Sequence, residues 1–567
     1  MLVRTLQASR RQLWQSHRTV RFSRKYNAQA QGPHTTYFQP PPPQQPSRAW
    51  RIVRALLWSS TCVGIGAFGA AWAFTTPLEE LMREAEEGVL ENALLAGTTD
   101  RFAREVQALD VESATALLEL QAAYSVCPAA VSHTAQHGSN LPCEDTWSSG
   151  SYAHFNDQKK DWSEWSIFDG HAGPRTSDAL CQLLPVAVGT LLEENKCMER
   201  SYVPNDSHII STIKKAFQSV DDALTEQTRK LIRNEMPMPI LNPLAPSKSQ
   251  QQEFYQMPLA QAVSAGALAF SGSCALLALF DPARSILRVA NVGDSRAVLG
   301  RWDAASNKYV AVPMSVDQTG FNPDEVARLA QEHPGEDVVD PKTGRVHGLA
   351  VTRAFGDARW KWTEEDTKLA HEKIWGPSPR PNGVIKTPPY LTAEPEIMET
   401  RLQTGDRPDF LIMASDGLWD NMTSDVAVAC VQAWLDKNKP MDFLEAPQHP
   451  PQSWQDVLKP GGPSSNLSVR TPTYSNPAEI TGEDDTYYDE EERCRKWKVD
   501  PKHFVVEDGN CGVHMIKNAL GGKRRDLFTG VMSVQPPLSR NVRDDITVHV
   551  VFFGQDNKME EIQKKKN

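Results

Sequence analysis

Four short acidic clusters border runs of apolar residues in this chain, and their side chains are the ones best suited to chemistry. The clusters are Glu144-Asp145, Asp169 in Phe168-Asp169-Gly170-His171, Asp416 in Ala414-Ser415-Asp416-Gly417, and Asp544-Asp545. Apolar runs such as residues 165–168, 410–414 and 546–553 are typical of strands, and a strand end holds a carboxylate rigidly. Carboxylates that share a cleft repel one another unless a cation lies between them, and Mg²⁺ and Mn²⁺ prefer oxygen ligands. The clusters therefore predict a metal-dependent hydrolase.

The periodicity of apolar residues predicts the elements that position these carboxylates. Residues 273–280, 286–292, 296–300, 410–414 and 546–553 predict strands, and residues 177–194, 209–232, 323–332 and 424–437 predict helices. Asn322 is the expected N-cap of the third helix, and Ser177 and Ser424 are expected at the starts of two others. Such a mixture favours an α+β fold in which stacked antiparallel sheets carry helices on their outer faces.

The catalytic body is expected to run over residues 129–554. Residues 234–258 and 437–500 are rich in proline and polar residues, so both are predicted to be insertions. Residues 79–128 are rich in Ala, Leu and Glu and predict a helical connector, whereas residues 555–567 form a charged tail.

The N-terminal region has the composition of a targeting segment. Residues 1–26 contain arginine, lysine and interleaved apolar residues but no acid, which is typical of a mitochondrial presequence. Disorder rich in serine and arginine is the alternative. Residues 27–54 predict a disordered linker rich in proline and glutamine.

Residues 55–74 carry no charge, and their length suits one crossing of the mitochondrial inner membrane. A buried helix is the alternative. Gly64, Gly66 and Gly69 fit the dinucleotide fingerprint, but no strand–turn–helix context surrounds them. The basic flank would leave the N-terminus in the matrix and the body outside it.

Charge and cysteine usage exclude some functions. The net charge is −11, and the first acidic residue is Glu79, so the body is more acidic than the total suggests. An acidic body argues against nucleic acid as a partner. Nine cysteines occur without a C-x-x-C pair, which fits a reducing compartment rather than a disulfide framework or a thiolate metal site.

The chain resembles the metal-dependent type 2C protein phosphatases in six segments that occur in the expected order. They are FDGHAG from Phe168, GSCA from Gly272, VANVGDSR from Val289, TRAFGD from Thr352, ASDGLWD from Ala414 and DDITV from Asp544. Three further stretches resemble the mitochondrial pyruvate dehydrogenase phosphatase branch: SNLPCED from Ser139, NPDEVARLAQEHP from Asn322 and TPPYLTAEPE from Thr387.

This resemblance implies an αββα sandwich with two Mg²⁺ or Mn²⁺ ions in the cleft between its sheets. Asp169 would bridge both ions, Asp416 and Asp544 would hold the first ion, and the Gly170 carbonyl would bind the second. Glu144 and Asp145 would act through waters bound to the ions. Asp294 would help to bind a third, weaker ion. Two ions about 4 Å apart acidify a bridging water and neutralise phosphoryl charge. The resulting hydroxide would attack a phosphoserine or phosphothreonine ester.

The leaving oxygen needs a proton, and His171 is the candidate donor because imidazole titrates near working pH. A purely structural histidine is the alternative. Asp294 also has an alternative role, in which its side chain accepts hydrogen bonds within its own turn. Asp357 and Asp420 are expected to be structural residues.

The sequence departs from the family in two places. Asn140 stands where many members have an arginine that clamps the substrate phosphate, and asparagine cannot form the charged fork. Arg353 is the arginine expected to bind the phosphate in its place. Gln318 stands where histidine is usual, and the sequence does not indicate its effect.

The leading hypothesis is a mitochondrial protein serine/threonine phosphatase that acts on a pyruvate dehydrogenase complex subunit. A stop-transfer helix at 55–74 would conflict with a matrix substrate, so the side of the inner membrane and the substrate stay open. The alternatives are an inactive membrane-tethered scaffold of the same fold, a phosphatase of another mitochondrial phosphoprotein, and a hydrolase of small phosphate esters.

Overall fold

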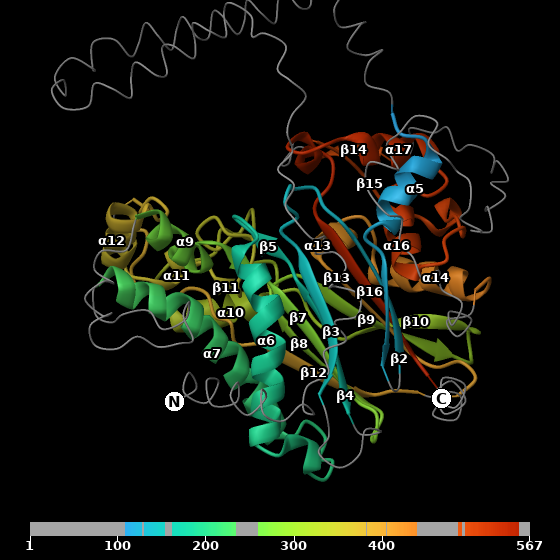
Figure 1. The fold of residues 1–567 in the computed structure, drawn as a ribbon, viewed down its shortest axis with the longest axis horizontal. Helices are drawn as coiled ribbons and strands as arrows, with labels where there is room; N and C mark the ends of the chain where they lie inside the picture. Colours follow the sequence, from blue (N-terminus) through green and yellow to red (C-terminus); the bar gives the residue numbers. More distant parts are fainter. Residues whose placement is uncertain are drawn as a thin grey trace, which may run out of the picture. The chain divides into compact units, whose positions relative to one another are not determined.

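The structure is a computed structural model that describes residues 108–127, 130–152, 161–233, 259–381, 383–403, 405–438, 486–489 and 494–554. The described residues from Leu109 onward belong to one compact unit. Two antiparallel sheets stack in its centre, with helices on both outer faces (Figure 1). This four-layer arrangement is the predicted αββα sandwich.

The larger sheet has six strands in the order β1-β2-β16-β13-β9-β10. The strands are β1 (Ala123–Cys127), β2 (Ala130–His137), β16 (Ile546–Phe553), β13 (Phe410–Ala414), β9 (Arg296–Asp303) and β10 (Lys308–Pro313). The last strand in the sequence, β16, lies between β2 and β13, with Ile546 opposite His137 and Ala414 opposite Val548. Strands β2 and β16 therefore lie side by side although they are about 400 residues apart in the sequence.

The second sheet has five strands in the order β12-β8-β7-β4-β3. They are β12 (Glu396–Arg401), β8 (Ile286–Val292), β7 (Ala275–Asp281), β4 (Trp162–Phe168) and β3 (Thr146–Tyr152). Every residue of β4, β7 and β8 is buried. These strands are buried on both faces because one face packs on the other sheet and the other face packs on helices.

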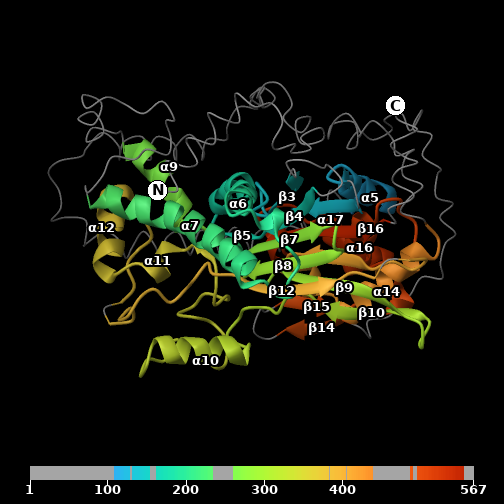
Figure 2. The same ribbon diagram turned by 90° about the horizontal axis from the view of Figure 1, so that it is seen from below.

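The alternation along β4 shows this double burial. Trp165 and Ile167 lie in the cluster between the two sheets, together with Leu411 and Val551 of the larger sheet. Trp162 and Phe168 face the opposite way, into the cluster beneath the helices α6 (Arg175–Glu194) and α7 (Ser207–Ile232). Figure 2 shows both helices on the outer side of this sheet.

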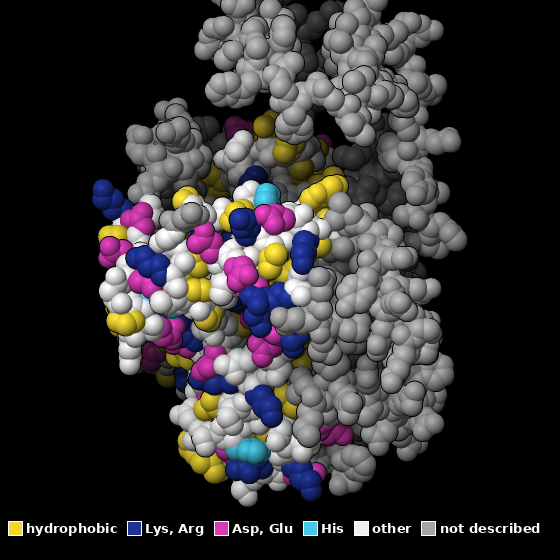
Figure 3. Space-filling model, turned by 90° about the vertical axis from the view of Figure 1, so that its left-hand side faces the viewer, with side chains coloured by type: hydrophobic (Ala, Val, Ile, Leu, Met, Phe, Trp, Pro, Cys, Tyr) yellow, Lys and Arg dark blue, Asp and Glu magenta, His cyan; other side chains and the backbone are white. Residues whose placement is uncertain are grey.

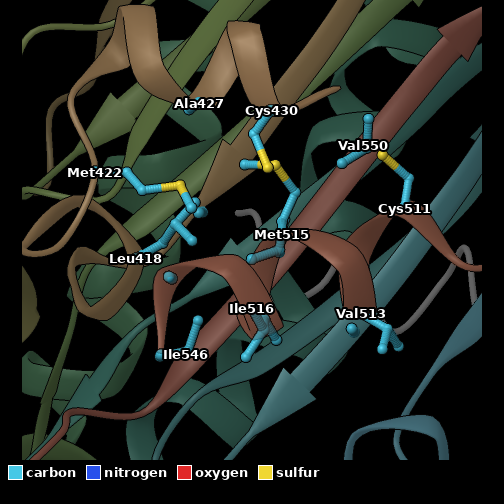
Figure 4. Packing of buried hydrophobic residues seen from close by; sticks show 14 of the residues in the cluster. Leu418, Met422, Ala427, Cys430, Cys511, Val513, Met515, Ile516, Ile546 and Val550 are labelled. Carbon is cyan, nitrogen blue, oxygen red and sulfur yellow. The ribbon is translucent and has the colours of Figure 1, made fainter. Parts of the chain in front are cut away.

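The outer face of the larger sheet is covered by α5 (Val111–Glu119), α14 (Ser424–Leu435), α16 (Cys511–Ala519) and α17 (Arg525–Ser533). Figure 4 shows the interior of this layer, where Met515 and Ile516 of α16 approach Cys430 of α14 and Ile546 of β16. The C-terminal third of the chain thus fixes the position of the strand that leads out of the Asp544-Asp545 cluster.

Shorter elements lie at the end of the sandwich where β4 and β13 finish. They are β5 (Gly170–His171), β6 (Gly272–Ser273), β11 (Phe355–Gly356), α9 (Leu259–Phe270), α10 (Pro323–Glu332), α11 (Ala358–Lys361), α12 (Glu364–Ile374) and α13 (Asp416–Trp419). The strands β11, β6 and β5 pair in that order. On the side that carries α12, basic and acidic side chains are interspersed rather than separated by sign (Figure 3).

The remaining described elements are the hairpin of β14 (Thr486–Asp489) and β15 (Cys494–Trp497), and the 3₁₀ turns η4 (Cys197–Glu199), η8 (Pro501–His503) and η9 (Leu538–Asn541). The hairpin lies within the predicted insertion at 437–500, whose other described parts are residues 437–438 and 498–500. The insertion at 234–258 lies outside the described residues.

Several boundaries differ from the sequence-based expectations. The described part of the expected connector at 79–128 contains α5 and β1, which pack into the sandwich, with β1 as its edge strand. Asn322 caps α10 as predicted, but Thr423 rather than Ser424 caps α14, and Ser177 lies inside the first turn of α6. Within the described residues no helix has the length and apolarity needed to cross a bilayer, and residues 1–26, 27–54, 55–74 and 555–567 lie outside them.

Candidate active site

Asp169 directly follows β4, so a fully buried strand sets the position of its backbone. Its carbonyl oxygen accepts a 2.8 Å hydrogen bond from the Cys274 N–H. A Cβ on the next residue, Gly170, would lie 2.3 Å from the Glu144 carbonyl oxygen. Glycine at 170 therefore allows the segment that carries Glu144 to pack directly against the segment that carries Asp169.

Asp416 and Asp294 complete a compact group with Asp169. Asp416 follows β13 as the first residue of α13, and Asp294 lies in the turn between β8 and β9. One carboxylate oxygen from each of the three residues lies within 4.8 Å of the others. Burial, followed by repulsion from Asp294, raises the pKa of Asp416 to about 7. Burial and the charge of Asp416 likewise hold the pKa of Asp169 well above its ordinary value.

The turn that carries Asp294 is held by Gln318. The Gly293 N–H donates a 2.8 Å hydrogen bond to Gln318 Oε1, and the Gln318 N–H donates a 3.0 Å bond to the Gly293 carbonyl. Gln318 is fully buried. The residue whose effect the sequence left open thus positions a member of the acidic group.

Asp145 lies beside this group and keeps one oxygen unused. Its side chain is 3% exposed, and Oδ2 accepts a 2.8 Å hydrogen bond from Thr547 Oγ1. Oδ1 is buried without a hydrogen-bond partner among the described residues. Burial, then the nearby charge of Asp545, raises the pKa of Asp145 to about 7. A buried carboxylate oxygen without a donor is a ready ligand for a cation or its bound water.

Glu144 is tied to the loop on either side of the site. Its carboxylate accepts a 2.7 Å hydrogen bond from Asn140 Nδ2 and a 2.6 Å bond from the Gly173 N–H. Gly173 belongs to the segment between β5 and α6. Glu144 therefore joins the first acidic loop to the loop that carries Asp169.

Asp545, which the sequence analysis named in an acidic cluster but gave no role of its own, holds the first acidic loop in place. Its Oδ1 accepts bonds from the backbone N–H groups of Ser139 (2.5 Å) and Asn140 (3.0 Å), and its Oδ2 accepts one of 2.7 Å from Glu144. Burial raises the pKa of Asp545, but these donors outweigh that effect and the pKa is lowered. The carboxylate is thus held ionised as an anchor for residues 139–144.

Asp544 pairs with an arginine and is not part of the group formed by Asp169, Asp294 and Asp416. It forms an ion pair with Arg540, four residues earlier on η9, and its side chain is 24% exposed. The structure therefore brings Asp169, Asp294 and Asp416 together and leaves Asp544 paired with a guanidinium.

His171 is anchored by Asp357. His171 Nε2 lies 2.7 Å from Asp357 Oδ2, and the two side chains are 27% and 2% exposed. Burial lowers the pKa of His171, but the Asp357 carboxylate outweighs this effect and the pKa is raised. Asp357 itself has a φ of 49°, in the left-handed region that aspartate tolerates better than most residues. The imidazole is therefore reachable from solvent and fixed in orientation.

The structure does not support either expected phosphate ligand as a free donor. Arg353 is 7% exposed and donates to the Glu325 carboxylate, the Glu394 carbonyl and Glu396, so it is a structural residue. The amide nitrogen of Asn140 is engaged by Glu144. A guanidinium held in a buried ion pair is costly to withdraw.

The donor set fits a hard divalent cation. The clustered ligands are all oxygens, they raise one another's pKa, and a buried Asp145 oxygen lacks a donor. A cation would relieve this repulsion, and an all-oxygen set is what Mg²⁺ and Mn²⁺ prefer. The cluster therefore suits the metal that the sequence predicts.

Comparison with known proteins agrees with this geometry. The family model for protein phosphatase 2C matches residues 244–447. A protein phosphatase 2C homolog of Schizosaccharomyces pombe is 36% identical over 428 residues, which cover 74% of this chain and 79% of the relative. This chain belongs to the protein phosphatase 2C family. It is thus a metal-dependent protein serine/threonine phosphatase, as the sequence predicted.

Two further relatives carry a more specific name. The mitochondrial phosphatase 1 of pyruvate dehydrogenase (acetyl-transferring) from Saccharomyces cerevisiae is 34% identical over 415 residues, covering 70% of this chain and 63% of the relative. Human mitochondrial phosphatase 2 of the same enzyme is 28% identical over 429 residues, covering 69% and 73%. The crystal structure of a serine-threonine phosphatase 2C from Toxoplasma gondii matches with a TM-score of 0.40 at 15% identity, covering 76% of this chain and 97% of that one.

Proposed function

We propose that this phosphatase acts in mitochondria on a phosphorylated serine or threonine of a pyruvate dehydrogenase complex subunit. The acid-free leader at 1–26 and the names of the Saccharomyces cerevisiae and human relatives support this proposal. The observation that carries the chemistry is the approach of the Asp169, Asp294 and Asp416 oxygens to within 4.8 Å of one another.

Two Mg²⁺ or Mn²⁺ ions would be held by this chain's oxygen ligands. The proposed ligands are Asp169, the Gly170 carbonyl, Asp416 and Asp544, with Glu144 and Asp145 acting through water and Asp294 serving a third, weaker ion. Such ions acidify a water and neutralise charge that develops on the phosphoryl group. The protein fixes its ligands at the ends of buried strands, so they need little rearrangement when the ions bind.

His171 is proposed to donate the proton that the departing serine or threonine oxygen requires. It lies two residues after Asp169, and its Nε2 is held by Asp357. An ion pair with a buried carboxylate favours the protonated imidazole, which is the form that can donate. Asp357 is the positioning residue for this step, and Gly272 provides the space in which the pair meets.

The proposal is tested with the purified chain, Mn²⁺ and phosphoserine or phosphothreonine peptides. Phosphate release should require Mn²⁺ and should vanish in Asp169→Ala and in Asp416→Ala. Asp303→Ala is the matched control, because Asp303 only caps the 303–306 turn at the surface. Release that survives exhaustive chelation would refute the metal site, and a wild-type protein without activity would indicate the scaffold alternative.

The substrate is tested separately. Phosphorylated pyruvate dehydrogenase subunit should be dephosphorylated with a higher kcat/KM than unrelated mitochondrial phosphoproteins and small phosphate esters. Protease protection of the body in intact mitochondria and in mitoplasts would show which substrates it can reach. Preference for a small ester would refute the protein-phosphatase proposal, and preference for another phosphoprotein would refute only the named substrate.

A further inference from the structure

A phosphorylated substrate brings a strongly negative group to a site that is itself negative. A phosphate monoester carries a charge of about −1.5 to −2 at pH 7. The site presents Asp169, Asp294 and Asp416 within 4.8 Å of one another. A guanidinium at the rim of such a site would both attract and orient the phosphate.

Arg540 lies at this rim. Its ion-pair partner Asp544 lies against the residue that follows Asp416, because a Cβ on Gly417 would lie 3.2 Å from the Asp544 Cβ. Arg540 pairs with Asp544, and its Nη1 lies 3.5 Å from Ser139 Oγ, next to Asn140. Its side chain is 47% exposed, which leaves the guanidinium open to a ligand from solvent.

The backbone that carries Arg540 is held firmly. The neighbouring Ser539 is fully buried, and its Oγ donates a 2.5 Å hydrogen bond to the Ser139 carbonyl. The η9 turn is therefore fastened to the loop that begins at Ser139. A side chain on a fastened turn loses less conformational freedom when it binds a ligand.

Three other described arginines, Arg296, Arg353 and Arg543, are held by other partners. Arg296 gives Nε and Nη2 to the Asp317 carboxylate at 2.9 and 2.5 Å, and its guanidinium lies over the Trp419 ring. Arg353 is buried against Glu325. Arg543 is 7% exposed and donates to the carbonyls of Val531 and Val534.

We propose that Arg540 binds the phosphate of the substrate and supplies the cationic donor that Asn140 cannot. This inference rests on the phosphatase function proposed above. A metal ion bound to Asp544 would neutralise its negative charge and weaken its ion pair with Arg540. Arg540 would then be available to phosphate, so metal binding and phosphate binding would favour each other. The planar guanidinium offers two parallel donors to two phosphate oxygens.

The test compares Arg540→Ala, Arg540→Lys and wild type in two assays. One assay measures kcat and KM for a phosphothreonine peptide at saturating Mn²⁺. The other measures the Kd of inorganic phosphate for the Mn²⁺-loaded protein by calorimetry, which needs no turnover. Arg200→Ala is the matched control, because Arg200 is 43% exposed, pairs with Asp206 and lies beyond the far end of α6.

Arg540→Ala should raise KM and the Kd of phosphate by about 10- to 100-fold, the worth of charged hydrogen bonds. The value of kcat should stay near wild type, because the lost interaction is made in both ground and transition states. The Mn²⁺ concentration for half-activation should not rise, because the substitution removes the arginine that pairs with Asp544. Arg540→Lys should fall between the two, since it keeps the charge and loses the fork. Arg200→Ala should match wild type.

Three results would overturn the inference. One is an unchanged KM and phosphate Kd in Arg540→Ala. Another is a defect confined to the Mn²⁺ requirement, which would make Arg540 a structural partner of Asp544. The third is a rise in KM in Arg175→Ala instead, because Arg175 is the exposed arginine at the start of α6. Failure of wild type to release phosphate from any phosphopeptide would refute the proposed function instead.

Discussion

Gly272→Ala should separate the proton donor from the rest of the catalytic machinery. Gly272 lies in β6, opposite His171 of β5 and Gly356 of β11. A Cβ at this position would lie 2.1 Å from His171 Nε2 and 2.2 Å from Asp357 Oδ2, the two atoms that now meet at 2.7 Å. Since ordinary non-bonded contacts are about 3.5 Å, the pair must separate or shift by about 1 Å.

The size of the effect follows from that shift. Overpacking a buried position costs about 1–3 kcal/mol of stability, so the variant should still fold. Misplacing a catalytic group by about 1 Å can cost about 100-fold in rate. We therefore expect kcat on a phosphoserine peptide to fall by about 10- to 100-fold, with little change in KM.

Leaving-group dependence makes this prediction specific. An aryl phosphate departs as a stabilised phenolate and needs no proton, so Gly272→Ala and Asp357→Asn should spare its turnover while slowing the phosphopeptide. Gly530→Ala is the control, because a Cβ there meets nothing within 4 Å. Equal losses on both substrates, or wild-type kcat on the phosphopeptide, would refute the role given to the His171–Asp357 pair.

Three further predictions concern charge. Asp416→Asn should abolish activity, because it removes a proposed metal ligand. It should raise the Tm of the metal-free protein, because it removes one of three carboxylates that repel one another, and calorimetry with and without Mn²⁺ measures this change. Asp545→Ala should cost about 2–4 kcal/mol by leaving three backbone N–H groups without an acceptor, measured by denaturant unfolding. Glu164 is fully buried, and burial raises its pKa from 4.5 to about 7. The folded protein therefore holds this proton more tightly than the unfolded chain does. The resulting contribution to the free energy of unfolding is fully present below pH 4.5 and is lost as the pH rises through 7. Glu164→Gln should remove this loss and be more stable than wild type at pH 8, by at most about 3 kcal/mol.

Much of the sandwich was predictable because its strands are buried on both faces. Runs rich in apolar and β-branched residues gave the bounds of β8, β13 and β16 as the structure has them, and Asn322 gave the start of α10. Strand β1 was missed because it has only five residues, none of them buried, and lies at the edge of the sheet.

The site was predictable only where the carboxylates follow strands. Asp169 and Asp416 follow β4 and β13, and each offers a carboxylate oxygen within 4.8 Å of one from Asp294, whereas the expected convergence was with Asp544. The partners of Arg353, Asn140 and Asp545 depend on side-chain contacts between distant segments, and no local pattern encodes them. The one available signal for Asp545 was its place beside Asp544, at the entrance to a buried strand.

The position of β16 makes completion of the larger sheet depend on a strand that is synthesised after all the strands beside it. Translation delivers β2 and β13 long before β16, so the six-stranded sheet stays divided into two halves until residues 546–553 arrive. A chain interrupted ahead of Ile546 presents two bare strand edges, which invite aggregation and degradation.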